Sequence, residues 1–204
     1  KGKIISAKIY NYLLEKSRVT STNELERSYH IFYQLLYGAN AAEREKHYIK
    51  DIEYFNYLNK SCFKIDDVND AEDFLITKEC IKKLGFKTEE ISLIFNVLMG
   101  ILYLGNVNFN EQEGFSATVD ESSQGDFKIA AELIGVEQSK LLSILTKKKL
   151  TDAMSKKIIE KLLSIEMVYN CRDALCKALY SKMFDYLVKR VNAAIANVDD
   201  NKSI

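Results

Sequence analysis

Hydrophobic residues recur every three or four positions over most of the chain, which is the spacing of amphipathic helices. This pattern and the glycines that follow it predict helices over residues 24–38, 69–84, 88–105, 126–134, 137–145 and 166–196. In the second of these, we expect the buried face to comprise Phe74, Leu75, Cys80, Ile81 and Leu84. The last helix is the longest, and no Pro or Gly interrupts it.

The first residues follow a different pattern. Residues 4–14 read IISAKIYNYLL, in which β-branched and aromatic residues partly alternate with polar ones, as in a strand. A lone strand leaves backbone groups without partners on both edges, so we expect its partner strands to lie outside this sequence. The predicted fold is mainly α with one N-terminal strand, and residues 107–109 are a second, short strand candidate.

The composition excludes several classes of protein. The 204 residues carry 29 Lys and Arg against 29 Asp and Glu, and a net charge of zero argues against a wholesale nucleic-acid or anionic-membrane binder. The four cysteines form no C-x-x-C pair, which disfavours zinc and fits reduced thiols in a cytosolic protein. No unbroken apolar run approaches the roughly 20 residues that span a membrane. The chain opens at Lys1 directly in an apolar pattern, so we expect it to be a piece of a longer protein.

The zero net charge conceals two oppositely charged stretches. Residues 110–126 hold five acidic residues and no Lys or Arg, and their Gly and Ser content predicts a surface loop. Residues 140–161 hold seven lysines against Asp152 and Glu160, a local charge of 7 − 2 = +5. The centre of this stretch, residues 146–159, is either a solvated loop or a contact for an acidic partner, with Leu150 and Met154 supplying apolar contact.

No catalytic motif is present in the sequence. The chain lacks G-x-x-x-x-G-K-[ST], G-x-G-x-x-G and G-x-S-x-G, so it has no Walker phosphate cradle and no nucleophile elbow. Cys171 and Cys176 lie five positions apart in the last helix and do not share a face well, so core thiols are favoured over a thiol enzyme.

Five ordered blocks of sequence resemble the myosin motor domain. LLEKSRV at residues 13–19 and ERSYHIFYQLLYGA at 26–39 are similar to the family's YLLEKSRV and ERNYHIFYQLL.GA. FNYLN at 55–59, ILYLGNVNF at 101–109 and RDALCKALYSKMFDYLVKRVN at 172–192 extend the resemblance in the same order over nearly the whole chain.

The resemblance implies the segment between switch I and switch II of a P-loop motor ATPase, which is the upper 50-kDa subdomain. Residues 1–204 would then be a partial motor domain, with 1–19 as the strand region of the central transducer sheet and 20–204 as a helical region. The P-loop and both switches lie outside this sequence, so ATP and Mg would bind the parent motor and this fragment alone should not hydrolyse ATP. The implied partners are F-actin, the remainder of the motor domain and light chains, with no nucleic acid and no membrane insertion, in the cytoplasm on the cytoskeleton.

The resemblance also implies roles for both charged stretches. Residues 146–159 align with the cardiomyopathy loop, an actin-contacting element, and residues 110–126 with loop 4, which approaches actin in some myosins. The implied actin contacts are Lys147, Lys148, Lys149, Leu150, Met154, Lys156 and Lys157. Many myosins carry Thr, Ser, Glu or Asp sixteen positions before the Asp of the D-A-L motif, and counting back from Asp173 gives Lys157. This departure puts phosphorylation control in doubt. An insertion would shift the count, and Ser155 and Thr151 lie nearby.

A last group of charges lies at the predicted junction of strand and helices. Glu15 and Arg18, with Glu26 and Arg27, are either simple surface pairs or a device that couples nucleotide state to the sheet. The alternative to a motor fragment is a non-motor helical scaffold or adaptor derived from the motor fold.

Overall fold

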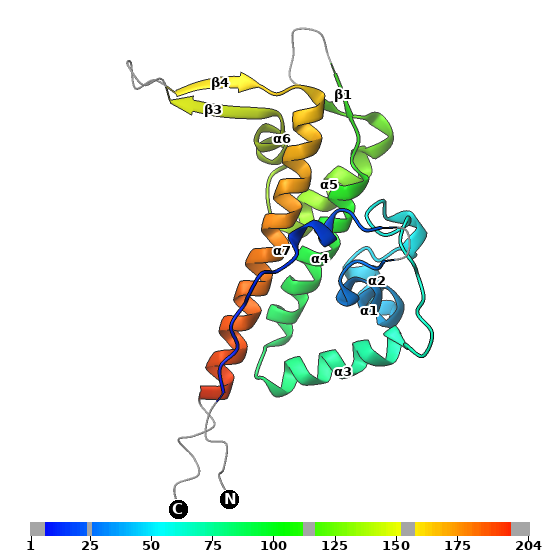
Figure 1. The fold of residues 1–204 in the computed structure, drawn as a ribbon. Coiled ribbons are helices and arrows are strands. Elements are labelled where there is room, and N and C mark those ends of the chain that lie inside the picture. The colour runs from blue at the N-terminus through cyan, green and yellow to red at the C-terminus, as the bar shows by residue number, and fades with distance from the viewer. Residues whose placement is uncertain (1–6, 24–25, 112–116, 152–157, 197–204) are drawn as a thin grey trace, which may run out of the picture.

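Two long helices lying side by side form the centre of the fold, as the predicted pattern requires. The computed structural model of the chain describes residues 7–23, 26–111, 117–151 and 158–196. Helix α4 (Thr88–Asn106) packs along α7 (Ile165–Ala196), and Figure 1 shows the two running the length of the molecule. The mainly helical fold is confirmed, as is the predicted extent of the last helix.

Helix α4 is the core of the protein. Every residue from Leu98 to Asn106 is buried, because α5 covers one side of the helix and α7 another. By the length and composition of an 18-residue window, the helix could cross a membrane, although polar residues within it interrupt its apolar runs, as predicted. Since 61% of that window is buried inside the fold, α4 behaves as the core helix of a folded domain.

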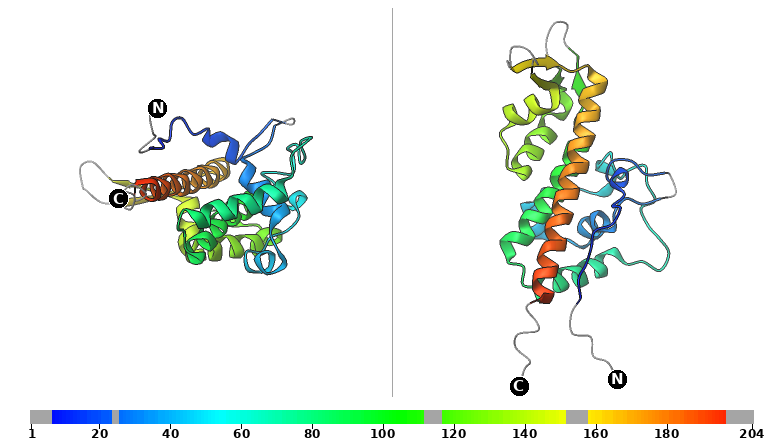
Figure 2. Two further views of the ribbon diagram at one scale, coloured as in Figure 1. Left: turned by 90° about the horizontal axis from the view of Figure 1, so that it is seen from below. Right: turned by 60° about the vertical axis from the view of Figure 1, so that its left-hand side comes forward.

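The remaining helices pack on either side of this pair (Figure 2). Near the end where α7 begins lie α5 (Gln124–Ile134) and α6 (Gln138–Thr146). A second group holds α1 (His30–Gly38), α2 (Ala41–Lys46) and α3 (Asp70–Lys83), of which α1 and α3 pack together. Short 3-10 turns η1 (Lys16–Val19), η2 (Ile52–Tyr54) and η3 (Glu121–Ser123) connect these groups.

Two short antiparallel ribbons complete the fold. Strand β1 (Phe109–Asn110) pairs with β2 (Thr118–Val119), where the sequence predicts a short strand at 107–109 followed by a loop. Strand β3 (Lys147–Thr151) pairs with β4 (Ile158–Leu162), so the prediction of a basic loop over 146–159 is wrong for its described part. That part is a ribbon that projects from the end of the molecule (Figure 1), and residues 152–157 lie outside the described chain.

The predicted N-terminal strand is not formed in the described residues. Residues 7–14 run beside α7 without joining a sheet (Figure 2), and residues 4–6 lie outside the described chain. The physical reason is that a strand needs a partner backbone, and the described chain provides none here. Asn192 on α7 takes that place: its side-chain amide accepts from the Ile9 N–H and donates to the Ile9 carbonyl, both at 2.8 Å.

The ends and faces of two helices differ from the prediction. Helix α1 begins at His30 and not at residue 24. Helix α3 begins as predicted, with Asn69 capping the Glu72 N–H, but Leu75 is 59% exposed and Cys80 is exposed too. Helix α3 meets the core along a narrow contact centred on Phe74, which is fully buried against α1, so the apolar residues beside that contact stay in solvent.

A charged clamp joins the start of α4 to the far part of α7. The Glu90 carboxylate accepts the Lys87 backbone N–H at 2.9 Å, receives the Tyr186 hydroxyl, and pairs with the Arg190 guanidinium at 3.1 and 3.2 Å. These donors lower the pKa of Glu90 to about 2, the backbone N–H of Lys87 contributing most. The clamp therefore joins α4 and α7 at the end of the pair where α4 begins.

Replacing Gly38 tests the contact between α1 and α3. A Cβ at Gly38 would lie 2.5 Å from Phe74 Cβ, so we expect Gly38→Ala to lower the free energy of unfolding by about 1–3 kcal/mol in urea denaturation. The control is Gly125→Ala in α5, where an added Cβ meets nothing within 4 Å and the change should be neutral or stabilising by up to about 1 kcal/mol. Equal effects of the two variants would contradict this packing.

The clamp predicts a specific pH dependence. A carboxylate with a depressed pKa contributes stability that is complete above its ordinary pKa of 4.5 and is lost as the pH falls towards about 2. We therefore expect Glu90→Gln to lower the free energy of unfolding at pH 7 and to do so much less at pH 3. Urea denaturation of both proteins at the two pH values measures this, and an equal difference at both would show that the charge of Glu90 is not responsible.

Candidate functional site

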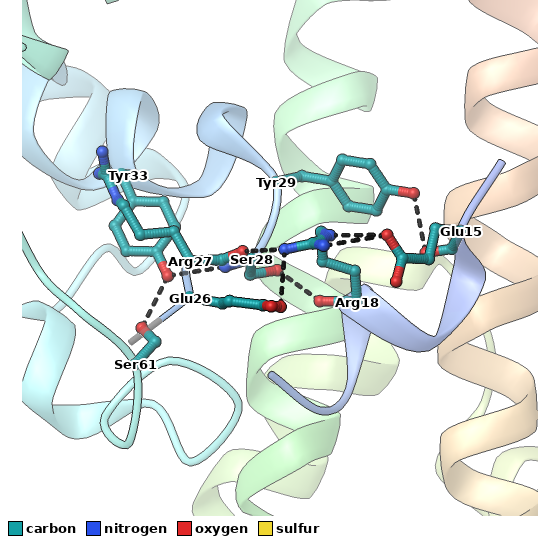
Figure 3. A network of polar contacts seen from close by, with 8 residues as sticks. All are labelled: Glu15, Arg18, Glu26, Arg27, Ser28, Tyr29, Tyr33 and Ser61. Atoms are coloured by element: carbon teal, nitrogen blue, oxygen red, sulfur yellow. Dashed lines mark hydrogen bonds and ion pairs between the residues drawn. The ribbon is translucent and has the colours of Figure 1, made fainter. Parts of the chain in front are cut away.

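The junction between the N-terminal segment and α1 gathers all four residues expected to couple the sheet to the helices. Arg18, in η1, pairs with the Glu15 carboxylate at 3.0 Å and with Glu26 at 3.3 Å, and it donates to the Arg27 carbonyl at 3.0 Å (Figure 3). The hydrogen bond from Arg18 to Glu15 raises the pKa of the guanidinium further. Arg18 is thus the hub that holds η1 against the segment leading into α1.

The sequence groups Arg27 with Glu15, Arg18 and Glu26, but its side chain pairs with a residue of α3. Its Nη2 donates to the Asp70 carboxylate, the first residue of α3, at 2.7 Å, and the two side chains are only 3% and 8% exposed. The guanidinium lies 3.7 Å from the centre of the Tyr33 ring. No described group accepts from Arg27 Nε or Nη1. No local pattern predicts this pair, because 43 residues separate its members in the sequence.

Hydroxyl groups extend this network to two further parts of the fold. The Ser28 N–H donates to the Tyr33 hydroxyl at 3.0 Å, and that hydroxyl lies 2.7 Å from the Ser61 hydroxyl (Figure 3). Tyr29 donates to the Glu15 carbonyl at 3.0 Å and stacks on Tyr180 of α7 with ring centres 4.4 Å apart. The junction therefore touches α1, α3 and α7 at once, an arrangement suited to holding elements in position.

The basic ribbon is the second candidate site. Lys147 and Lys149 pair with Glu160 on the opposite strand, at 3.3 and 4.0 Å. Lys148 lies opposite Lys161, and Leu150 is 41% exposed beside them. Met154, Lys156 and the regulatory candidate Lys157 lie outside the described residues, so the structure does not test them.

The acidic stretch 110–126 is partly structural. Asp120 accepts from the Ser122 hydroxyl, from the Asn110 amide and from the Ser122 N–H, and these hydrogen bonds lower the pKa of the Asp120 carboxyl, the Ser122 hydroxyl contributing most. Asp126 accepts from the Tyr54 hydroxyl, and burial together with this carboxylate raises the pKa of Tyr54 to about 12. Two of the five acidic groups therefore hold the local fold, and Glu113 lies outside the described residues.

One thiol, that of Cys176, belongs to the hydrophobic core. Cys176 is buried under Tyr57, and burial raises the pKa of its thiol to about 12, so it is not a nucleophile at neutral pH. Within the described residues, no group of three His, Cys, Asp or Glu side chains is placed to hold a metal ion. Both candidate sites are thus suited to binding and positioning.

The first residues of the D-A-L block have a structural role. Arg172 is 9% exposed and donates to the Val107 carbonyl at 2.9 Å, just beyond the end of α4. Asp173 accepts from Arg172 and from the Tyr57 hydroxyl at 2.6 Å. These contacts fix α7 against the end of α4, close to the ribbons.

The buried pair of Arg27 and Asp70 can be tested against an exposed one. Asp70→Ala leaves a buried guanidinium without its counter-ion, so we expect it to lower the free energy of unfolding by about 3–5 kcal/mol. The control is Asp51→Ala, which removes the partner of Arg44 at 2.9 Å but from a side chain that is 88% exposed, and should cost about 0–1 kcal/mol. Urea denaturation measures both, and similar losses would show that burial of the pair does not matter.

Comparison with known proteins identifies the family. All of residues 1–204 match the family described as Myosin head (motor domain). The chain is 38% identical over 206 residues to Myosin-17 of Arabidopsis thaliana, covering 100% of this chain and 13% of that protein. It is 38% identical over 199 residues to Myosin-1 of the same plant, covering 96% and 17%, and 36% identical over 205 residues to Myosin-1 of Sclerotinia sclerotiorum, covering 100% and 16%. The chain therefore spans less than a fifth of the length of these relatives. Since the match covers the whole chain, the protein belongs to the myosin head (motor domain) family.

Proposed function

We propose that this chain acts as the upper 50-kDa subdomain of an actin-based, ATP-driven cytoskeletal motor. In this proposal residues 1–19 join the transducer sheet and residues 20–204 form the helical region that contacts actin. ATP and Mg bind elsewhere in the motor, since the chain contains no Walker cradle. The rest of the motor domain and light chains are its other partners, in the cytoplasm on the cytoskeleton.

The observation that carries the proposal is the separation, along α7, of the lysine ribbon from the contact with the N-terminal segment. The lysine ribbon leads directly into the first residue of this helix, and Asn192, near its other end, holds the N-terminal segment (Figure 1). One end of the molecule thus presents positive charge to a partner, while the other contacts the segment that the resemblance assigns to the sheet.

The charge of the ribbon suits a filament with an acidic surface. Lys148, Lys149 and Lys161 are exposed, and attraction between a basic and an acidic surface raises the rate of encounter. The exposed Leu150 adds an apolar contact to the same surface. These features support the actin-contact role of the described lysines.

The network around Arg18 supports a coupling role for Glu15, Arg18, Glu26 and Arg27. Because Arg18 binds residues from both sides of η1, a change in the direction of the N-terminal segment must move or break its contacts. Tyr29 carries the same displacement to α7 through its ring stack on Tyr180. In our proposal, this is how a change in the sheet reaches the helices.

Charge reversal in the ribbon tests the proposal. We expect Lys147→Glu, Lys148→Glu and Lys149→Glu together, in the motor head containing this chain, to weaken co-sedimentation with F-actin by about tenfold or more at low salt. The salt dependence of binding should also flatten, since fewer ionic contacts remain to be screened.

The control reverses the same number of charges at the other end of the molecule. Lys82, Lys83 and Lys87 are exposed near the end of α3 and the start of α4, far from the ribbon (Figure 1). Reversing these three should leave actin binding within about twofold of the unaltered head. Unchanged binding of the ribbon variant over several salt concentrations would overturn the actin-contact role, and would favour a scaffold derived from the motor fold.

A further inference from the structure

The two faces of the lysine ribbon carry different charge. Side chains alternate between the faces of a strand, so Lys147 and Lys149 project to one side and Lys148 and Leu150 to the other. The register places Glu160 opposite Lys149 and Lys161 opposite Lys148. One face therefore mixes both signs of charge, while the other shows only positive charge among its described residues.

The mixed face adjoins α6 and is partly neutralised, although the Lys149 side chain on it is 71% exposed. Glu160 pairs with both Lys147 and Lys149, which leaves this face with less free positive charge. The same two lysines line a hollow of about 420 Å³ with Lys140, Ser143 and Ile144 of α6. We call this side, with Lys147, Lys149 and Glu160, the inner face.

The opposite side, with Lys148, Leu150 and Lys161, is the outer face. Lys148 and Lys161 are directly opposed, and such a pair has Cβ atoms about 4.5–5.5 Å apart. Within the described residues, neither ammonium group lies within 4.0 Å of a carboxylate, and both side chains are exposed. Like charges held in this way repel each other, so a carboxylate placed between them from outside would remove a repulsion as well as add two attractions.

We propose that the outer face, formed by Lys148 and Lys161 with Leu150 beside them, is the surface that docks on an acidic protein partner. The inference rests on the proposed function, in which that partner is the actin filament. The chemistry of the outer face fits a cluster of carboxylates next to a small apolar area, for which Leu150 provides the contact. Lys161 thereby becomes a contact residue, and Lys147 and Lys149 serve chiefly to hold the ribbon through Glu160.

Two variants with equal change in charge separate the faces. In the motor head containing this chain, we expect Lys148→Gln with Lys161→Gln to weaken F-actin co-sedimentation by roughly three- to tenfold at low salt. Lys147→Gln with Lys149→Gln removes the same two charges from the inner face and should weaken binding clearly less than the outer pair does. Circular dichroism of each variant checks that the helical fold is kept.

The outcomes test separately the assignment of the outer face and the proposal that the ribbon contacts actin. If the inner pair weakens binding as much as the outer pair, or more, the assignment of the outer face is wrong while the ribbon remains an actin contact. If neither pair changes binding, the ribbon does not contact actin and the proposed function of this site fails with it.

Zero-length crosslinking of the unaltered head provides a measurement that needs no variant. A carbodiimide activates a carboxylate, and a lysine amine in direct contact displaces the activating group as a urea to form an amide. We expect peptides in which Lys148 or Lys161 is joined to an acidic residue of actin, and internal links from Lys147 to Glu160, whose charged atoms are 3.3 Å apart. Actin joined to Lys147 or Lys149, with none at Lys148 or Lys161, would overturn the inference.

Discussion

The burial of α4 is the constraint on which the rest of this fold depends. Its residues from Ile101 to Leu104 are fully buried, because α5 and α7 pack on it and the α1–α3 group closes the remaining core. Burial of this apolar area is the main stabilising term available to a helical chain, at about 25 cal/mol per Å². The junction around Arg18 packs against α7, and the lysine ribbon extends from α6, which packs against α5 and α7.

Polar contacts then determine how the elements approach α4. Arg172 and Asp173 fix α7 at one end of α4, and Glu90 with Arg190 fixes it at the other. Arg27 and Asp70 join the entry of α1 to the first residue of α3. A buried ion pair adds little net stability but is costly to break, so such pairs favour one arrangement of helices over its alternatives. The core supplies stability, and these pairs supply a defined geometry.

The parts that the sequence predicts well are those decided by local interactions. Helical spacing and the Asn69 cap correctly predicted where α3 begins, and helical spacing predicted the extent of α7. The described part of the predicted N-terminal strand is unpaired, because a strand forms only beside a partner strand, which is expected outside this sequence. Here the side-chain amide of Asn192 bonds to the Ile9 backbone. The ribbon was not predicted because three consecutive lysines show no alternation of polar and apolar residues. The pair of Arg27 and Asp70 was not predicted because 43 residues separate the two in the sequence. Within the candidate sites, residue types were predictable, whereas faces and partners depended on tertiary contacts.

The uninterrupted length of α7 has a mechanical consequence. Its 32 residues contain no Gly or Pro, so at 1.5 Å per residue it forms a stiff rod of about 48 Å. A tilt of about 5° around one end of such a rod moves the other by about 4 Å, more than the length of a hydrogen bond. Since the ribbon precedes Ile165 and Asn192 lies near the opposite end, a small rotation at one end becomes a displacement large enough to exchange contacts at the other.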